Sequence, residues 1–503
     1  MQLNIRKLIA ALPAADVISL PETEVLGVVG DSRLVQPGYL FVSIPGSQVD
    51  GHQFVDDAIR RGAVAVVAQH PVAVPEGTGL VLVPDSRRAL SILAAEFWGH
   101  PSRRLRTVGI TGTNGKTTTA YLVKAVAEAA GSRAGVIGTA GTMLGDDLLE
   151  AKTGFTTPEA PTLHRLLATM AAHGADLVAM EVSSHALEQQ RVADCHFDVA
   201  VFTNLTHEHL DYHKDMESYF AAKARLFRML EPGATAVVNL DDPYGARMAA
   251  QVAPGVRVVT YGFCPEAQVR AEELVQTDTG VEYRLVTPEG EAWVRSPYLF
   301  GTYNVSNALA AVSATLSLGY SLEAAVQALA RAKGAPGRFQ RVDLGQDFLV
   351  VVDYAHTPDG FEKLLRDVVR LRQPGGRIIM VFGSAGHRDR TKRPEMGRIA
   401  ATYCDVLVLT EEDPRTEDPM EIAREIASGV DRPGVEVYLI EDRLEAIRFA
   451  IGSARTGDIV LITGKGNETE LEVLHPTAWH GDVPAAEEAL REMLATSGGG
   501  RRG

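Results

Sequence analysis

The residues between Thr107 and Thr119, TVGITGTNGKTTT, have the types and spacing that bind nucleotide phosphates. A β-branched run predicts a buried strand, two glycines follow it, and Lys116 and Thr117 lead into a helical pattern. Glycines let backbone N–H groups approach phosphate oxygens, a helix N-terminus is partly positive, and the lysine and hydroxyl suit terminal phosphates and Mg²⁺. The strict G-x-x-x-x-G-K-[ST] pattern fails, because its first glycine would fall at Ile110. A plain glycine turn is the alternative, but lysine followed by threonine favours a phosphate-binding loop.

Polar residues end other apolar runs of the same segment. Glu181 ends the run ADLVAMEVSS, and threonine, serine and histidine residues follow neighbouring runs. Strands alternate with helices here, which predicts a doubly wound parallel sheet whose ligands bind beyond the carboxyl ends of the strands. An isolated glutamate at such an end is where a Mg²⁺ ligand is expected. A helix-capping or salt-bridged glutamate is the alternative reading of Glu181.

The segment THEHLDYH, from Thr206 to His213, contains three histidines and two carboxylates. This composition raises the possibility of a zinc site, but the spacing does not match the H-E-x-x-H pattern of a zinc-binding helix. We therefore favour a role for one of these histidines beside a Mg²⁺-nucleotide.

Length and composition limit the class of protein. At 503 residues the chain is long enough for about three domains. Hydrophobic content of 46% and charged content of 22% are typical of a globular protein, and no stretch approaches the length of a membrane span. A net charge of −15 argues against a general nucleic-acid binder. Three cysteines without C-x-x-C spacing indicate neither a disulfide framework nor a zinc ribbon, which fits a reducing cytoplasm.

The alternation of apolar runs and helical patterns predicts an α/β protein of three domains. We expect a small α/β domain over 1–100, a central P-loop doubly wound domain over 101–333, and a Rossmann-like domain over 334–503. The stretch 101–106 is predicted to be a linker, and residues 280–297 an antiparallel hairpin. No G-x-G-x-x-G fingerprint follows the first strand of the third domain, so a bound dinucleotide is not indicated.

Charged loops follow the predicted strands of the third domain, at 386–393, 411–415 and 464–468. Cationic and anionic groups alternate there, which suits a ligand that carries both carboxylates and ammonium groups. Solvated loops that cap helices are the alternative. Asn304 and Asn307 stand at a predicted helix start, where they either cap the helix or contact a nucleotide base.

Eight motifs in order carry a resemblance to a known family: GITGTNGKTTT, TTPEAPT, EVSSHALEQQRV, FTNLTHEHLDYH, YFAAKARLF, GTYNVSNALA, VVDYAHTPDG and GSAGHRDRTKRPEMG. The chain resembles the Mur ligases of peptidoglycan synthesis, most closely the branch that adds the third amino acid. The resemblance runs from Asp31 to Glu468. Folylpolyglutamate synthetases share the ATPase core, but they lack the uridine-binding domain that DSR and DGHQF indicate here.

The resemblance implies that ATP phosphorylates the D-glutamate carboxylate of a UDP-muramoyl dipeptide and that an amine then attacks the acyl phosphate. Catalysis would be mostly positioning and charge neutralisation. The implied catalytic residues are Lys116, Glu181, His209 and Lys223. The implied Mg²⁺ ligands are Thr117, Glu181, His209 and, if it is carbamylated, Lys223. The implied ATP-binding residues are Gly112, Thr113, Asn114, Gly115, Lys116, Thr117, Thr118, Asn304, Asn307, Arg338 and Asp353.

The resemblance also implies two further sets of binding residues. The UDP-dipeptide set is Ser32, His52, Thr156, Thr157, Ser183, Gln189 and Arg191. The set for the incoming amino acid is Arg388, Glu412, Asp413, Arg415, Gly464 and Glu468. The remaining expectations are a monomer without nucleic-acid partner or membrane insertion, located in the cytoplasm.

The acceptor loops depart from the family pattern. Members that add meso-diaminopimelate carry DNPR and GKGHE, where this chain has EDPR and GKGNE. Arg415 is retained, and a guanidinium that clamps a second carboxylate favours meso-diaminopimelate as acceptor. Asp413 cannot donate to a carboxylate unless it is protonated, so L-lysine or L-ornithine stays an alternative. A non-catalytic nucleotide-binding relative is the alternative of another class, although it would be expected to have lost part of the catalytic set.

Overall fold

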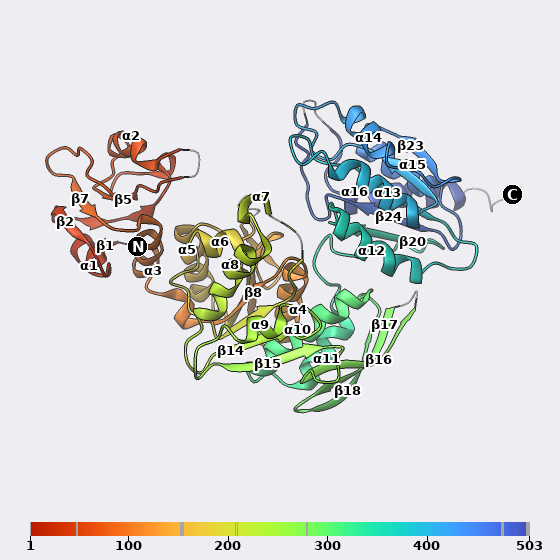
Figure 1. Cartoon of the computed structure of the whole chain (residues 1–503), viewed down its shortest axis with the longest axis horizontal. Coiled ribbons are helices and arrows are strands. Elements are labelled where there is room, and N and C mark those ends of the chain that lie inside the picture. Colours follow the sequence, from red (N-terminus) through yellow and green to blue (C-terminus); the bar gives the residue numbers. More distant parts are fainter. Residues whose placement is uncertain are drawn as a thin grey trace. The chain divides into compact units, whose positions relative to one another are not determined.

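The computed structural model describes residues 2–46, 49–150, 155–206, 208, 210–277, 280–473 and 477–498. The chain forms two compact units, Met1–Val269 with Leu309–Ala325, and Arg270–Ala308 with Val326–Gly503. Each is built from α/β layers, which confirms the predicted fold class (Figure 1). Within the described part of the chain, no helix is both long and apolar enough to cross a membrane.

The N-terminal sheet has the strand order β2-β7-β6-β5-β4, in which only β2 is antiparallel. Alternate strand residues face opposite layers: Leu40 and Val42 pack toward α1 and α3, whereas Phe41 packs toward α2. The strands are β2 (Asp16–Ser19), β4 (Gly27–Val29), β5 (Tyr39–Val42), β6 (Ala65–Ala68) and β7 (Gly79–Leu82). The helices are α1 (Ile5–Ala10), α2 (Val55–Arg60) and α3 (Ser86–Phe97). A separate two-stranded sheet is formed by β1 (Leu3–Asn4) and β3 (Glu24–Val25).

The central sheet of the first unit runs β11-β10-β9-β12-β8-β13-β14-β15 and is parallel from β9 to β15, as predicted. The antiparallel edge formed by β10 and β11 was not predicted. The strands are β8 (Arg106–Thr111), β9 (Ala134–Gly138), β10 (Gly141–Leu144), β11 (Asp147–Glu150), β12 (Leu177–Glu181), β13 (Val199–Phe202), β14 (Thr235–Asn239) and β15 (Arg257–Gly262). The helices are α4 (Lys116–Ala129), α5 (Ala160–Ala172), α6 (Ser184–Glu188), α7 (Leu210–His213), α8 (Met216–Arg228) and α9 (Gly245–Ala249).

The predicted linker at 101–106 is instead ordered. Pro101–Arg104 forms a 3₁₀ turn, and β8 begins at Arg106. Proline is tolerated in the first turn of a helix because that turn has no intrahelical partner for its N–H, so Pro101 starts a turn here.

The predicted hairpin of the second unit is confirmed as β17 (Gly280–Thr287) and β18 (Gly290–Ser296), with β16 (Val269–Thr277) antiparallel to β17. Helices α10 (Thr302–Ser317) and α11 (Leu322–Arg331) follow it in the chain. The C-terminal sheet has the order β19-β20-β24-β21-β22-β23, parallel except for β19. Its strands are β19 (Gln340–Val342), β20 (Leu349–Asp353), β21 (Ile378–Phe382), β22 (Val406–Leu409), β23 (Glu436–Leu439) and β24 (Ile459–Thr463).

Helices cover both faces of the C-terminal sheet (Figure 1). On strand β21, Met380 and Phe382 pack against α12, α13 and α14, whereas Ile379 and Val381 pack on the side of α15 and α16. The helices are α12 (Pro358–Arg370), α13 (Lys392–Tyr403), α14 (Pro419–Ala427), α15 (Arg443–Gly452) and α16 (Asp482–Gly498).

A fully buried ion pair joins α15 to α16. Arg443 and Asp482 have 0% exposed side chains and form two hydrogen bonds of 2.8 Å. Trp479 Nε1 donates to Asp482 at 3.1 Å, and Arg443 also donates to the Thr463 carbonyl, at the end of β24. The pair therefore ties both helices to the strand that precedes a predicted acceptor loop.

Asp482→Asn is expected to lower the free energy of unfolding by about 3 to 5 kcal/mol, because it leaves a buried guanidinium without its counter-charge. Urea unfolding followed by circular dichroism measures the change. The matched control is Asp359→Asn, which breaks an exposed pair with Lys363 and should cost less than about 1 kcal/mol. Equal losses in the two variants would contradict a structural role for the buried pair.

Candidate active site

The phosphate-binding loop connects β8 to α4 in a conformation that requires glycine. Gly112 has φ 155° and Gly115 has φ 85°. A Cβ on Gly112 would lie 1.8 Å from Thr203 Oγ1, which itself donates to the Asn114 carbonyl at 2.6 Å. Thr203, which follows β13, therefore packs against Gly112 and holds the loop through its bond to Asn114. Lys116 Nζ donates to the carbonyls of Gly112 and Thr113 at 2.9 and 2.8 Å.

Glu181, at the end of β12, is brought to this loop as predicted. Its carboxylate is buried, with 1% of the residue exposed, and accepts the Thr117 hydroxyl at 2.9 Å. Thr139, which the sequence did not single out, donates its N–H to the same carboxylate at 2.8 Å. Both hydrogen-bond donors are neutral, so neither of them neutralises the charge of the Glu181 carboxylate. A buried carboxylate beside a threonine hydroxyl offers the oxygen ligands that a hard divalent cation such as Mg²⁺ prefers.

Lys223 on α8 approaches the same loop from another helix. Its buried Nζ donates to the Gly112 carbonyl at 2.8 Å. Burial, together with the nearby charge of Lys116, holds the pKa of Lys223 well below its usual range. A neutral amine is the form that can react with CO₂ to give a carbamate. His209, the other predicted metal ligand, lies outside the described residues, as does His207.

The predicted dipeptide-binding residues converge beside Glu181. The Thr157 hydroxyl donates to the Glu181 carbonyl at 2.9 Å and accepts the Ser183 N–H at 3.0 Å. Arg191 donates to the Thr157 carbonyl at 2.9 Å, and its Nη2 donates to Gln189 Oε1 at 2.6 Å. This network places a guanidinium near the phosphate loop, where a carboxylate substrate would need it.

Two neighbours extend this network. Thr156 and Thr139 share a hydroxyl–hydroxyl contact of 3.2 Å, which connects the dipeptide set to the Glu181 carboxylate. The Arg191 guanidinium lies 4.3 Å from the centre of the Phe155 ring, a cation–π contact.

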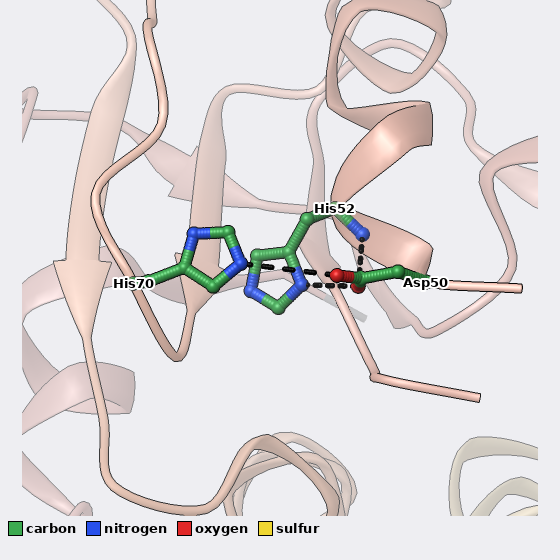
Figure 2. A group of neighbouring side chains, drawn as sticks. All are labelled: Asp50, His52 and His70. Carbon is green, nitrogen blue, oxygen red and sulfur yellow. Dashed lines mark hydrogen bonds and ion pairs between the residues drawn. The ribbon is translucent and has the colours of Figure 1, made fainter. Parts of the chain in front are cut away.

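His52 lies in the N-terminal domain, in a cluster with Asp50 and His70 (Figure 2). Its Nδ1 is 2.6 Å from Asp50 Oδ1, and its Nε2 accepts the Gln69 N–H at 3.0 Å. The two imidazole rings stack, with centroids 3.8 Å apart and planes inclined by 19°. Ring nitrogens bind metals through lone pairs in the ring plane, and stacked rings do not direct these at one ion. The cluster therefore does not favour a metal site. Ser32, the other predicted uridine-region residue, is buried at the start of a 3₁₀ turn, Ser32–Leu34.

Asn304 and Asn307 lie in the second unit, inside α10, and both are buried. Asn304 Nδ2 donates to the Phe300 carbonyl at 2.8 Å, and Asn307 Nδ2 donates to Asn304 Oδ1 at 3.4 Å. Both bonds have an amide N–H as donor, and the Asn304 side-chain oxygen accepts from Asn307, whereas a helix cap accepts from a backbone N–H of the first turn. The capping alternative is therefore wrong for both residues.

Arg338 and Asp353, the other predicted nucleotide contacts, lie beside each other in the second unit. The Arg338 guanidinium is 4.0 Å from the centre of the Tyr354 ring. Asp353 accepts the N–H groups of Phe339 and Ala355, each at 2.7 Å, so its carboxylate is anchored to the loops on both sides. Burial raises the pKa of Asp353, which Arg338 partly offsets.

The predicted acceptor residues follow the neighbouring strands β21, β22 and β24. Asp413 has φ 47°, and both its oxygens accept from Lys465 Nζ, at 2.7 and 2.8 Å. Lys465 is also 2.6 Å from Glu468 Oε2. The charge of Asp413 is therefore offset inside the protein, by a lysine that the sequence analysis did not assign.

The predicted guanidiniums of this region differ in their partners. Arg415 has φ 56°, its Nε donates to Glu472 Oε2 at 2.6 Å, and its Nη1 donates to the Gly386 carbonyl. Arg388 is exposed, and no carboxylate is paired with it among the residues that the structure describes. Arg388 is thus the more accessible of the two to an incoming anion.

Glu412 lies buried beneath these loops. Its Oε2 has no hydrogen-bond partner within the described part of the chain, and a Cβ on Gly464 would lie 2.1 Å from that atom. Burial raises the pKa of Glu412 to about 7, although Arg443, Lys392 and Lys465 act in the opposite direction. Glu412 is therefore partly protonated near neutral pH.

Because the pKa of Glu412 is higher in the folded than in the unfolded protein, the folded state binds the extra proton between pH 4.5 and about 7. Stability is therefore lost as pH rises through this window, by roughly 3 kcal/mol in total. Glu412→Gln is expected to remove this loss, so its advantage over the wild type should be small at pH 4.5 and largest at pH 8. Unfolding temperatures of both proteins across this range measure it. A variant that is less stable than the wild type at pH 8 would contradict the assignment.

Sequence models of three domain families match this chain. The Mur ligase family catalytic domain matches residues 24–98, the Mur ligase middle domain residues 110–315, and the Mur ligase glutamate ligase domain residues 337–466. The middle-domain match contains the phosphate loop, Glu181 and Lys223, and the third match contains Arg388 and Arg415.

Full-length relatives agree with these matches. The chain is 46% identical to the UDP-N-acetylmuramoyl-L-alanyl-D-glutamate--2,6-diaminopimelate ligase of Geobacillus thermodenitrificans, over 97% of this chain and 100% of the relative. It is 45% identical to the ligase of the same name from Geobacillus kaustophilus, over 92% and 94%. A solved structure of a ligase of that name superposes with a TM-score of 0.71 at 33% identity, covering 99% of this chain and 100% of that chain. The chain belongs to the Mur ligase family.

Proposed function

We propose that this protein is an ATP-dependent ligase that adds meso-diaminopimelate to UDP-N-acetylmuramoyl-L-alanyl-D-glutamate in peptidoglycan precursor synthesis. The observation that carries the proposal is the convergence of the phosphate loop, Glu181, Lys223 and the Thr157–Arg191 network at one edge of the central sheet. This edge brings groups for phosphates beside groups for a carboxylate, which is what phosphorylation of a carboxylate needs.

In the proposed reaction the D-glutamate carboxylate attacks the γ-phosphate of ATP, which leaves ADP and an acyl phosphate. The acceptor amine then attacks the acyl carbon, and phosphate leaves as the amide forms. Lys116 holds the terminal phosphates and Arg191 orients the substrate carboxylate. Mg²⁺, held by Thr117, Glu181 and His209, would neutralise phosphate charge when bound.

The sequence contains no thiol suited to act as a nucleophile in this reaction. Cys195 and Cys404 are free but buried, Cys264 is free and partly buried, and burial raises the pKa of all three thiols. Positioning and charge neutralisation carry the chemistry instead. A carbamate on Lys223 would convert a buried amine into an anion that faces the metal. We place the reaction in the cytoplasm, in a monomeric enzyme.

Arg415 and Arg388 support meso-diaminopimelate as the acceptor, because its second carboxylate suits a guanidinium. Asp413 replaces the asparagine of DNPR, and its charge argues against binding a second carboxylate. This argument is weakened because Lys465 neutralises the Asp413 carboxylate. L-Lysine and L-ornithine lack the second carboxylate, so they would not make this guanidinium contact.

Phosphate release with UDP-N-acetylmuramoyl-L-alanyl-D-glutamate, ATP and Mg²⁺ is expected to require an amino acid. We expect kcat/KM for meso-diaminopimelate to exceed that for L-lysine at least roughly tenfold, the worth of one charged hydrogen-bonded contact. A preference for L-lysine or L-ornithine would overturn the acceptor assignment. If none of the three amino acids supports phosphate release, the ligase proposal is contradicted and a non-catalytic relative is favoured.

Lys223→Ala is expected to lower kcat roughly 100-fold, because it removes the group whose carbamate would face the metal. Added formate or acetate should restore part of this activity by supplying a small carboxylate in the space left by the lysine. Lys116→Ala is the control: it should lose activity comparably without such rescue, since a cation is missing. Rescue of both variants or of neither would contradict carbamylation of Lys223.

A further inference from the structure

The ion pair between Arg415 and Glu472 differs in exposure from the neighbouring pair between Asp413 and Lys465. The Glu472 side chain is 63% exposed, whereas the Asp413 side chain, paired with Lys465, is 18% exposed. Glu472 Oε2 meets Arg415 Nε at 2.6 Å. The Arg415–Glu472 pair is thus closer to the surface than the neighbouring Asp413–Lys465 pair.

The backbone of Glu472 is anchored independently of its side chain. Its N–H donates to Asp413 Oδ1 at 2.9 Å, and its carbonyl accepts the Arg415 N–H at 2.8 Å. Arg415 is itself anchored by its bond to the Gly386 carbonyl. The Glu472 carboxylate can therefore leave Arg415 by a side-chain rotation, with both loops in place.

We propose that Glu472 is an internal stand-in for the second carboxylate of the acceptor, which displaces it from Arg415 on binding. This inference rests on the proposed function, because it takes Arg415 as the guanidinium that binds the acceptor. The exchange replaces an exposed pair, which contributes little, by a charge-assisted bond from the Arg415 guanidinium to the second carboxylate of the acceptor. An acceptor without a second carboxylate does not displace Glu472, so Glu472 lowers the affinity for meso-diaminopimelate and leaves the affinity for L-lysine unchanged.

Glu472→Gln tests the proposal in the full-length protein. Removing the competing carboxylate should lower the KM for meso-diaminopimelate about two- to fivefold, the worth of an exposed ion pair, with kcat unchanged. The KM for L-lysine should not fall. Equilibrium dialysis with labelled meso-diaminopimelate should show the same gain in affinity without turnover.

Glu470→Gln is the matched control, because Glu470 is exposed on the same loop and its substitution removes the same charge. It should leave the KM and the affinity unchanged. A higher KM in Glu472→Gln would show that Glu472 binds the acceptor's ammonium group, and equal effects of the two variants would reduce the result to net charge. Either result overturns the proposal, as does an absence of measurable binding to both proteins.

Loss of turnover in the wild type with every acceptor would instead count against the proposed function. The dialysis result stands apart from that outcome, because it measures binding of meso-diaminopimelate alone.

Discussion

Two lysine amines converge on one peptide oxygen, the carbonyl of Gly112. Lys116 reaches it from the first turn of α4 and Lys223 from the middle of α8. Burial holds the pKa of Lys223 well below its usual range, and the charge of Lys116 lowers it further. The shared contact connects the phosphate loop to α8. Glycine at 112 is required because Thr203 leaves no room for a side chain.

The second unit also contains buried charges, and these are paired with opposite charges. The Arg443–Asp482 pair and the Asp413–Lys465 pair hold the base of the acceptor loops, where paired charges are shielded from water. The exposed Arg415–Glu472 pair lies where a ligand has access. The buried pairs hold the loops in place. A charged ligand that exchanges with the exposed Arg415–Glu472 pair can therefore bind without a change in loop conformation.

Much of the fold could be predicted from periodicity. The parallel strands from β9 to β15 and the β17–β18 hairpin follow from their apolar runs and turns. The antiparallel strands β10 and β11 could not, because their short segments carry no strong apolar alternation and depend on pairing with β9. Asn304 was assigned two roles from its position near a helix start, and its place inside α10 with a bond to the Phe300 carbonyl excluded the cap.

The residues of the site were predicted on different grounds. The loop GTNGKT and Glu181 followed from residue chemistry, whereas Lys223 and the acceptor residues came from resemblance to the Mur ligases. Thr139 and Lys465 were missed, because a threonine in a turn and a lysine in a charged loop have no distinguishing local pattern.

The sequence by itself determined the α/β class, the phosphate loop and the family, because these depend on local spacing and on motifs in order. Tertiary structure decided which charges meet: Glu181 with Thr117, Lys223 with Gly112, and Asp413 with Lys465. The physical reason is that pairing and desolvation depend on through-space distance and burial. Residues more than fifty positions apart in the chain become neighbours only when each sheet is assembled with the helices and loops around it.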